Sequence, residues 1–362
     1  MKRKEVEERT IFVGLAGSHA YGLNHPKSDY DYRGIFIAPK EYYLGFNSIE
    51  QKDSGWNEEG IFPFINGNED TVIYELKKVV QLLSAANPNV LELLWLDNYP
   101  SLTEVGEYLI EHRQLFLSKK VKHTYSGYAF AQVKKIETHR KWLLQPPQSK
   151  PLPAEFGIEN EAPLTKDELN AFLEYLYNLV RGRIEFLEEA EELYQLLTAD
   201  IDFKGMLKQY TLPDETLAYT QQLTNGRSDF IRLLQKSQKY QGAMREWKAY
   251  LSWQQNRNPA RAEMEKQSGF DLKHGMHCIR LLRCGLEILR EGKVIVNRKV
   301  AGDVDQLKAI LQGAYSYEQV MKMAEDLIAQ MDEAMQQSTL PHSPDLTIIN
   351  QLCIELVERQ GW

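Results

Sequence analysis

The sequence predicts an α+β protein, with a small sheet-containing core over residues 1–100 and a large all-α extension over residues 101–362. Short apolar runs that favour strands occur near the N-terminus, whereas apolar residues recur at helical spacing beyond residue 100. A chain of 362 residues is long enough for a second domain or a large extension. The segment QPPQSKPLP has four prolines in nine residues, which interrupt any helix or strand, so we expect a linker over about 145–164.

Three segments of the core are predicted to be strands. Residues 10–16 (TIFVGLA) form a mostly apolar run with a β-branched start, which favours a buried strand that enters a turn. Residues 29–37 alternate and then become apolar, and residues 71–74 (TVIY) form a third run. Residues 75–86 have helical apolar spacing and stop at an Asn-Pro pair, because the residue before proline resists the helical conformation. Strands that bracket helices in this way indicate a layered core.

The extension is predicted to contain several long helices. Thr165-Lys166-Asp167-Glu168 is a capping box in front of an apolar-periodic run over residues 169–197. The same spacing predicts helices over 228–255, 271–290, 317–337 and 345–359.

Composition and charge restrict the class of protein. The three cysteines (Cys278, Cys284 and Cys353) form no C-x-x-C pair, which argues against a disulfide framework and a zinc knuckle. No apolar stretch is long enough to cross a membrane and the charged N-terminus is not a secretory signal, so we expect a cytoplasmic protein. The net charge is −8, but residues 227–299 hold 16 Lys and Arg against 7 Asp and Glu. This basic segment is expected to face an anionic ligand at the active site, although a solvated basic helix surface is an equal alternative.

The segment GSHAYGLNHPKSDYD, which begins at Gly17, combines residue types that suit phosphate and metal binding. A Gly-Ser turn at the end of a strand lets backbone N–H groups and a hydroxyl approach phosphate oxygens closely. Asp29 and Asp31 are separated by one residue on a strand, so their side chains point to the same side. Neighbouring carboxylates repel, and a shared divalent cation such as Mg²⁺ relieves that repulsion. A D-x-D pair alone is weak evidence for such a site, whereas Gly17-Ser18 at this spacing strengthens it.

This segment resembles the G-S-x(9–13)-D-x-D signature of the polymerase-β-like nucleotidyltransferase superfamily. More narrowly, the chain is similar to predicted bacterial and phage nucleotidyltransferases of the RNA-repair-pathway, RNA-ligase-associated polymerase-β family. The similarity extends to four blocks, which sample most of the chain except residues 150–225: GSHAYGLNHPKSDYDYRGIFI, DTVIYELKKVVQLLSAANPNVLELLW, REWKAYLSWQQNRNPARAEMEKQSGFDLKHGMHCIRLL and GAYSYEQV. The resemblance implies a small mixed-sheet core of the polymerase-β type.

The resemblance also implies roles for individual residues. Gly17 and Ser18 would bind the β- and γ-phosphates of a nucleoside triphosphate, and Asp29 and Asp31 would ligate two metal ions, Mg²⁺ or Mn²⁺. Members of the superfamily place a third carboxylate on a neighbouring strand, where it completes one metal site. Asp70, at the start of the TVIY strand, is the first choice for this third metal ligand and catalytic residue. The alternatives are Glu75, Glu69 and a purely turn-forming role for Asp70.

Basic residues elsewhere are weaker candidates for nucleotide contacts. Lys77 follows the third strand and Lys119 lies in a lysine cluster, and either could reach a triphosphate, although most lysines are simply solvated. Lys273, His277 and Arg280 share one helix face and are expected to hold phosphate or the acceptor backbone. Histidines and a cysteine on this helix invite a zinc interpretation, but the sequence supplies no clear third and fourth ligand.

Aromatic residues and one bibasic turn complete the candidates. Tyr125 and Tyr128 could stack on a base, although packing in the core is the more common role. The stripe Trp247, Tyr250 and Trp253 is more typical of a core. The turn NRNPAR at 256–261 contains two arginines that suit phosphate, or it merely connects two helices.

The function expected from these features is metal-dependent transfer of a nucleoside monophosphate from an NTP to a hydroxyl acceptor, with release of pyrophosphate. The resemblance and the basic segment suggest an RNA 3′ end, including that of tRNA, as the acceptor. One alternative is nucleotidylation of a protein or a small molecule. Another is a non-catalytic NTP- or RNA-binding regulator, which the intact Ser18, Asp29 and Asp31 disfavour.

Overall fold

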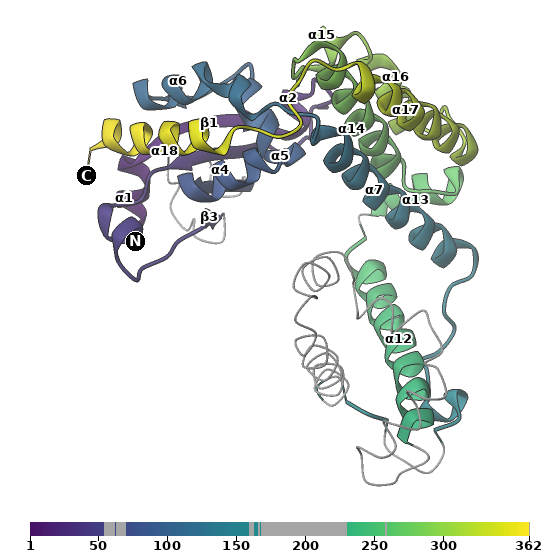
Figure 1. Cartoon of the computed structure of the whole chain (residues 1–362). Coiled ribbons are helices and arrows are strands. Elements are labelled where there is room, and N and C mark those ends of the chain that lie inside the picture. The colour runs from purple at the N-terminus through teal and green to yellow at the C-terminus, as the bar shows by residue number, and fades with distance from the viewer. Residues whose placement is uncertain are drawn as a thin grey trace, which may run out of the picture. The chain divides into compact units, whose positions relative to one another are not determined.

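The chain forms two units in the computed structural model, which describes residues 1–53, 62, 70–158, 163–165, 167, 230–257 and 259–361 (Figure 1). The first unit comprises Met1–Leu144 and Pro259–Trp362, and the second comprises Gln145–Asn258. Each unit is described by itself. Within the described ranges, none of the helices has the length and apolar character needed to cross a lipid bilayer.

A five-stranded mixed sheet lies in the N-terminal part of the first unit. The spatial order of the strands is β3-β4-β2-β1-β5, with β2 and β4 parallel and the other pairs antiparallel. This confirms the predicted α+β class, and the three predicted strands correspond to β1, β2 and β4. The strands are β1 (Thr10–Ala16), β2 (Asp31–Phe36), β3 (Gln51–Asp53), β4 (Asp70–Glu75) and β5 (Ser101–Leu102).

The register of the three central strands aligns their polar ends. Ala16 at the end of β1 pairs with Asp31 at the start of β2, and Asp31 pairs with Asp70 at the start of β4. At the other end, Phe36 pairs with Glu75. The start of the Gly-Ser turn and two of the predicted carboxylates therefore share one end of the sheet.

The sheet is accompanied by helices from both ends of the chain. α18, the last helix, contacts α4 and α6, and it lies beside them in Figure 1. Its position brings the C-terminal part of the chain onto the N-terminal core. These helices are α1 (Arg3–Glu8), α2 (Gly17–Ala20), α3 (Lys40–Leu44), α4 (Leu76–Ser84), α5 (Pro88–Leu91), α6 (Glu104–Glu111) and α18 (Leu346–Gln360).

The rest of the first unit is a helical assembly built around α14. α14 packs most extensively against α7, then against α17 and α16. Predicted helices over 271–290, 317–337 and 345–359 correspond to α14, α17 and α18. The members of this assembly are α7 (Val121–Leu144), α13 (Pro259–Ser268), α14 (Leu272–Glu291), α15 (Arg298–Ala301), α16 (Val304–Leu311) and α17 (Tyr317–Gln337).

One large apolar core runs from the sheet into this assembly. It includes Phe12 of β1, Leu83 of α4, Ile279 of α14 and Leu356 of α18. A smaller cluster, which includes Val13 of β1, Tyr32 and Phe36 of β2 and Ile73 of β4, forms a separate core on the sheet. The boundary expected near residue 100 falls just before β5, which pairs with β1, so the sheet and its helical cover both use residues beyond it.

In the part of the second unit that the structure describes, the elements are α12 (Phe230–Gln255) and a 3₁₀ turn (Pro153–Phe156). Lys236 Nζ donates a hydrogen bond to Gly157 O at 2.7 Å, and Leu164 N donates to Ser237 Oγ at 3.0 Å, so the described parts of residues 145–165 lie along α12. The aromatic stripe of α12 is arranged as predicted for one helix face, with successive ring centroids 6.0 Å apart. The helix predicted over 169–197 lies outside the described residues, as do two of the four residues of its capping box.

Candidate functional site

Two aspartates lie side by side at the start of neighbouring parallel strands. Asp31 is the first residue of β2 and Asp70 is the first residue of β4, and the two form a register pair. Paired residues of adjacent strands point to the same face of a sheet, so both carboxylates occupy one side. Asp29 precedes Asp31 by two residues, is exposed, and acts on Asp31 through its negative charge. The structure thus brings together all three carboxylates that the sequence analysis selected.

Arg33 bridges the two paired carboxylates. Its Nη2 lies 2.7 Å from Asp70 Oδ2 and 3.9 Å from Asp31 Oδ1. Its Nη1 also donates hydrogen bonds to the backbone oxygens of Tyr32 and Asp70, each at 2.8 Å. The guanidinium therefore neutralises part of the repulsion between the aspartates and fixes the position of Asp70.

The electrostatic surroundings of Asp31 oppose its ionisation. Burial raises the pKa of this carboxyl most, and the negative charges of Asp70 and Asp29 add to the increase. Arg33 and Lys273 lower the pKa, but the balance stays above the ordinary value. A divalent cation beside these carboxylates would stabilise the ionised form. Lys273 of α14, predicted from sequence to contact phosphate, is therefore near enough to the carboxylates to act on them.

Gly17 is packed directly against the Asp31 carboxylate. It has a φ of +63° and begins α2 immediately after β1. A Cβ atom at this position would lie 2.7 Å from Asp31 Cγ and closer still to Oδ2. Only glycine combines this backbone conformation with this approach. Ser18 is the next residue of α2 and is half-buried, so the predicted phosphate-binding turn adjoins the carboxylates.

Arg280 does not form part of an open basic face, which corrects the expectation that it would hold phosphate. Its side chain is 4% exposed, and Nη1 donates to Glu92 Oε2 at 3.1 Å. The guanidinium lies 3.7 Å from the centroid of the Tyr21 ring, and the Tyr21 hydroxyl donates to Glu92 Oε1. This buried cluster instead joins the segment after α2 to α14.

His277 does not supply a positive charge either. Burial and the positive charges of Arg280, Lys273 and His274 lower the pKa of His277 to about 3. The imidazole is therefore neutral at physiological pH and can contact a phosphate only as a hydrogen-bond donor. Of the three residues predicted to form the basic face of this helix, Lys273 alone has the expected charge and exposure.

Two further lysines were predicted to contact the nucleotide. Lys77 lies beyond Glu75, at the opposite end of β4 from Asp70, and its Nζ lies 5.1 Å from the centroid of the Tyr43 ring. The length of β4 thus separates Lys77 from the carboxylates, which contradicts its predicted contact. Lys119 lies just before α7, where its backbone N–H donates to Pro341 O at 2.8 Å. Its contact with nucleotide stays a prediction.

Glu75 and Glu69 are the alternatives to Asp70 as the third carboxylate of the site. Glu75 lies at the far end of β4, accepts a hydrogen bond from the Tyr43 hydroxyl at 2.6 Å, and caps α4 by accepting from Lys77 N at 2.7 Å. It is 4% exposed, so its carboxylate is already satisfied inside the fold. Glu69 lies outside the described residues. Asp70 therefore has the geometry expected of the third carboxylate.

The weaker candidates also have defined places. Tyr125 is 2% exposed and belongs to the core, so it cannot stack on a base. Tyr128 is half-buried and accepts a hydrogen bond from Asn87 Nδ2 at 2.7 Å. The basic segment 227–299 spans both units, and three of its arginines form ion pairs within the first unit: Arg280, Arg283 and Arg298. That the rest of the segment faces the active site stays a prediction.

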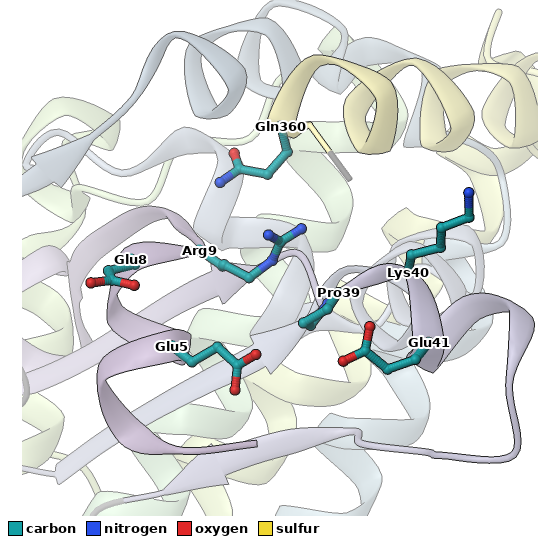
Figure 2. Close-up of a pocket in the computed structure, with 7 residues that line it drawn as sticks. All are labelled: Glu5, Glu8, Arg9, Pro39, Lys40, Glu41 and Gln360. Carbon is teal, nitrogen blue, oxygen red and sulfur yellow. The ribbon is translucent and has the colours of Figure 1, made fainter.

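A hollow of about 710 Å³ lies at the opposite end of the central strands, beside the residues that precede β1 and follow β2. Figure 2 shows its mixed lining, in which acidic and basic side chains alternate, with Lys40 and Glu41 beside each other. Arg9 is held there by donating from Nε to Ile37 O at 2.8 Å and from Nη2 to Gly361 O at 3.0 Å. The hollow does not adjoin the aspartates, so it is not the candidate active site.

The donor set of the candidate site is suited to a hard divalent cation. Asp29, Asp31 and Asp70 offer only carboxylate oxygens, which Mg²⁺ and Mn²⁺ prefer. The raised pKa of Asp31 is typical of carboxylates at functional sites, and its contact with Gly17 limits where the carboxylate can lie. Arg33 was not selected from the sequence, although its position two residues after Asp31 places it on the same strand face.

Comparison with known proteins gives one family match. The model of the RNA repair pathway DNA polymerase beta family matches residues 1–200, a range that contains all three carboxylates. The chain is 28% identical over 131 residues to an uncharacterized 38.9 kDa protein from the nrdC-mobD intergenic region of Enterobacteria phage T4, covering 35% of this chain and 38% of the phage protein. It is 35% identical over 86 residues to the uncharacterized protein YcgL of Bacillus subtilis (strain 168), covering 24% of this chain and 30% of YcgL. The chain thus spans well under half the length of these two relatives. No solved structure matches it.

Proposed function

The chain belongs to the RNA repair pathway DNA polymerase beta family, and from this premise we propose that it transfers a nucleoside monophosphate from an NTP to a hydroxyl acceptor and releases pyrophosphate. Membership of a polymerase-β-like family indicates a nucleotidyltransferase. The single observation that carries the proposal is the parallel register that pairs Asp31 with Asp70, with Gly17 closed against the Asp31 carboxylate. This arrangement supports the proposal because it sets carboxylates beside a Gly-Ser turn, a backbone shape whose N–H groups suit phosphate oxygens.

The proposed work of each residue follows from its chemistry. Asp29, Asp31 and Asp70 would hold Mg²⁺ or Mn²⁺ through carboxylate oxygens. When bound, the metal supplies charge neutralisation to the triphosphate and lowers the pKa of the acceptor hydroxyl. The backbone N–H groups of Gly17 and Ser18 would donate to the β- and γ-phosphates, and Lys273 would add a positive charge. Arg33 would keep Asp70 in position while the site fills.

An RNA 3′ end is the proposed acceptor. The description of the family refers to an RNA repair pathway, and Lys273 adds positive charge next to the carboxylates. An acceptor that carries many phosphates would bind through several Lys and Arg side chains. Binding to RNA should therefore weaken steeply as the salt concentration rises, whereas a protein or small-molecule acceptor should show a shallow dependence.

The test is incubation of the purified chain with each α-³²P-labelled NTP, total cellular RNA, and either Mg²⁺ or Mn²⁺. We expect label on RNA with one preferred NTP, and its loss in the double variant Asp29→Ala/Asp31→Ala. Asp53→Asn, which changes an exposed aspartate of β3 in the same sheet, is the matched control and should leave the label unchanged.

Other outcomes would identify a different reaction. Label on protein bands that depends on Asp29 and Asp31 would indicate nucleotidylation of a protein instead of RNA. The absence of label from every acceptor, together with measurable NTP binding, would contradict the transfer proposal and favour a regulator. Label that persists in the double variant would show that these carboxylates are not the catalytic ones.

A further inference from the structure

Three side chains with metal-binding groups converge where α7 meets the start of α14, and none of them is a carboxylate that the proposed function uses. His139, Asp271 and His274 each offer one ligand atom, and the three atoms lie within 4.8 Å of one another. Asp271 Oδ2 is 3.5 Å from His274 Nε2 and 3.9 Å from His139 Nδ1. The Asp271 side chain is 8% exposed, so its carboxylate is turned into the protein.

The backbone and one neighbouring side chain orient these groups. Asp271 caps α14, with Oδ1 accepting from His274 N at 3.0 Å, which leaves Oδ2 directed at the imidazoles. His274 Nδ1 lies 2.7 Å from Gln132 Oε1, so this nitrogen carries the proton and donates. The other nitrogen, Nε2, faces Asp271 Oδ2, and the same carboxylate also interacts with the His139 side chain. A bound cation would replace these contacts with metal–ligand bonds.

The donor set distinguishes this cluster from the carboxylate site. Two imidazoles and one carboxylate are typical ligands of Zn²⁺, whereas Mg²⁺ prefers oxygen ligands alone. Metal–ligand bonds of about 2.0–2.2 Å place tetrahedral ligand atoms roughly 3.3 Å apart. The two separations that involve Asp271, 3.5 and 3.9 Å, need only small inward shifts to reach that spacing, and all three ligand atoms lie within 4.8 Å of one another. The contact between Gln132 and His274 is the kind of outer hydrogen bond that fixes the tautomer of a metal-binding histidine.

We propose that His139, Asp271 and His274 bind one Zn²⁺ ion, with water or the adjacent buried carboxylate of Glu265 as a fourth ligand. The ion would join α7 to the first turn of α14, two helices far apart in the sequence that pack against each other. The sequence shows two histidines and two cysteines on α14 but cannot show that His139 of α7 lies opposite them. This proposal does not depend on the proposed nucleotidyl transfer.

The test uses the full chain, freed of metal with EDTA and transferred to buffer that contains excess Mg²⁺ to occupy the carboxylate site. Zn²⁺ is then titrated in competition with a chromophoric chelator. We expect one equivalent of tightly bound Zn²⁺, retained in Asp29→Asn/Asp31→Asn and lost in His139→Ala/His274→Ala. His277→Ala changes a histidine that follows His274 by three residues on α14 and is not in the cluster, and it is the matched control. Gln132→Ala keeps all three ligands and should weaken binding by about 10- to 100-fold.

A second measurement does not require any variant to fold. Co²⁺ added to the metal-free wild-type chain should give the visible absorption bands of a four-coordinate nitrogen and oxygen site, and Zn²⁺ should remove them. The absence of stoichiometric Zn²⁺ binding by the wild-type chain would overturn the proposal. So would binding that survives in a folded His139→Ala/His274→Ala variant, or binding that is lost in Asp29→Asn/Asp31→Asn.

Discussion

Gly17 is the first residue of α2, directly after β1, and it lies against the Asp31 side chain. The residue at position 17 therefore determines where the Asp31 carboxylate lies. We predict that Gly17→Ala lowers nucleotidyl transfer by at least about 100-fold, because its methyl group would displace a metal ligand. The affinity for Mg²⁺ should fall in parallel. Rates of transfer and a Mg²⁺ titration of the variant measure both effects.

The strain of an alanine at positive φ needs its own control. Gly302 has a φ of +82°, and a Cβ atom there would meet nothing within 4 Å. Gly302→Ala should therefore cost about 1 kcal/mol of stability, similar to the backbone cost at position 17, and leave transfer unchanged. Equal activities of the two variants would contradict a role for Gly17 in placing Asp31.

The raised pKa of Asp31 should make the stability of the metal-free chain depend on pH. Burial, together with the charges of Asp70 and Asp29, raises its pKa in the folded chain despite the opposing charges of Arg33 and Lys273. The folded state then holds this proton at a higher pH than the unfolded state does. Without metal, its contribution to stability therefore decreases as the pH rises from the ordinary aspartate value through the raised value, and the loss is complete above it.

We predict that Asp31→Asn removes this dependence. In EDTA the variant should have a higher melting temperature than the wild type near neutral pH, and the difference should shrink as the pH falls through the raised pKa. Transfer should fall by about a thousandfold, since several kcal/mol of charge stabilisation are lost with the ligand. A variant that is less stable than the metal-free wild type at neutral pH would show that Asp31 is not held under electrostatic strain.

The candidate site was predictable from sequence where its parts are local. Gly17, Asp29 and Asp31 come from one segment, but the strand predicted from Asp29 begins at Asp31, so strand alternation does not place Asp29. The burial of Arg280 was not predictable from the sequence, because it depends on Glu92 and Tyr21 from distant segments. Helical spacing identifies which residues share a face but does not say what covers that face.

At the scale of elements, the cluster of Arg280, Glu92 and Tyr21 connects three segments of the first unit. The ion pair between Arg280 and Glu92 is buried, with side chains 4% and 11% exposed. We predict that Glu92→Gln lowers the free energy of unfolding by about 3–5 kcal/mol, because it leaves the guanidinium without a countercharge. Urea unfolding measures this loss.

An exposed arginine of α14, the helix that carries Arg280, provides the control for Glu92→Gln. Arg290 of α14 donates to Gln330 at an exposed position, and Arg290→Gln should change stability by less than about 0.5 kcal/mol. Should Glu92→Gln be as mild as Arg290→Gln, the buried pair would not hold the segment after α2 to α14.

The long and periodic elements were predictable, and the short ones were not. α4, α14, α17 and α18 follow from apolar spacing, because one face of each packs on the core. β5 has two residues and is specified by its pairing with β1, so no local pattern marks it. The same holds for β3, an edge strand of three residues with little burial.

At the scale of the whole molecule, the sheet depends on α18, the last helix, for part of its apolar cover. α18 contacts α4 and α6, and its Leu352 and Leu356 are 3% and 0% exposed within the same core as β1. A fragment that ends near residue 100 would lack this cover and would expose apolar surface. The sequence predicts the helix but not its partners, because packing across the length of a chain leaves no local signal.

This dependence leads to a prediction on α18 itself. Leu356→Ala should lower the free energy of unfolding by about 2–5 kcal/mol, because it opens a cavity in a core shared by the sheet and the helices. Ile354, on the same helix, is 44% exposed, so Ile354→Ala should cost less than about 0.5 kcal/mol. Urea unfolding followed by circular dichroism, and by Mg²⁺-dependent NTP binding as a probe of the sheet, should report the same shifted midpoint for Leu356→Ala. Separate midpoints would mean that the sheet and the helical part of the first unit unfold independently, in which case the shared core does not couple the active site to the C-terminal helix.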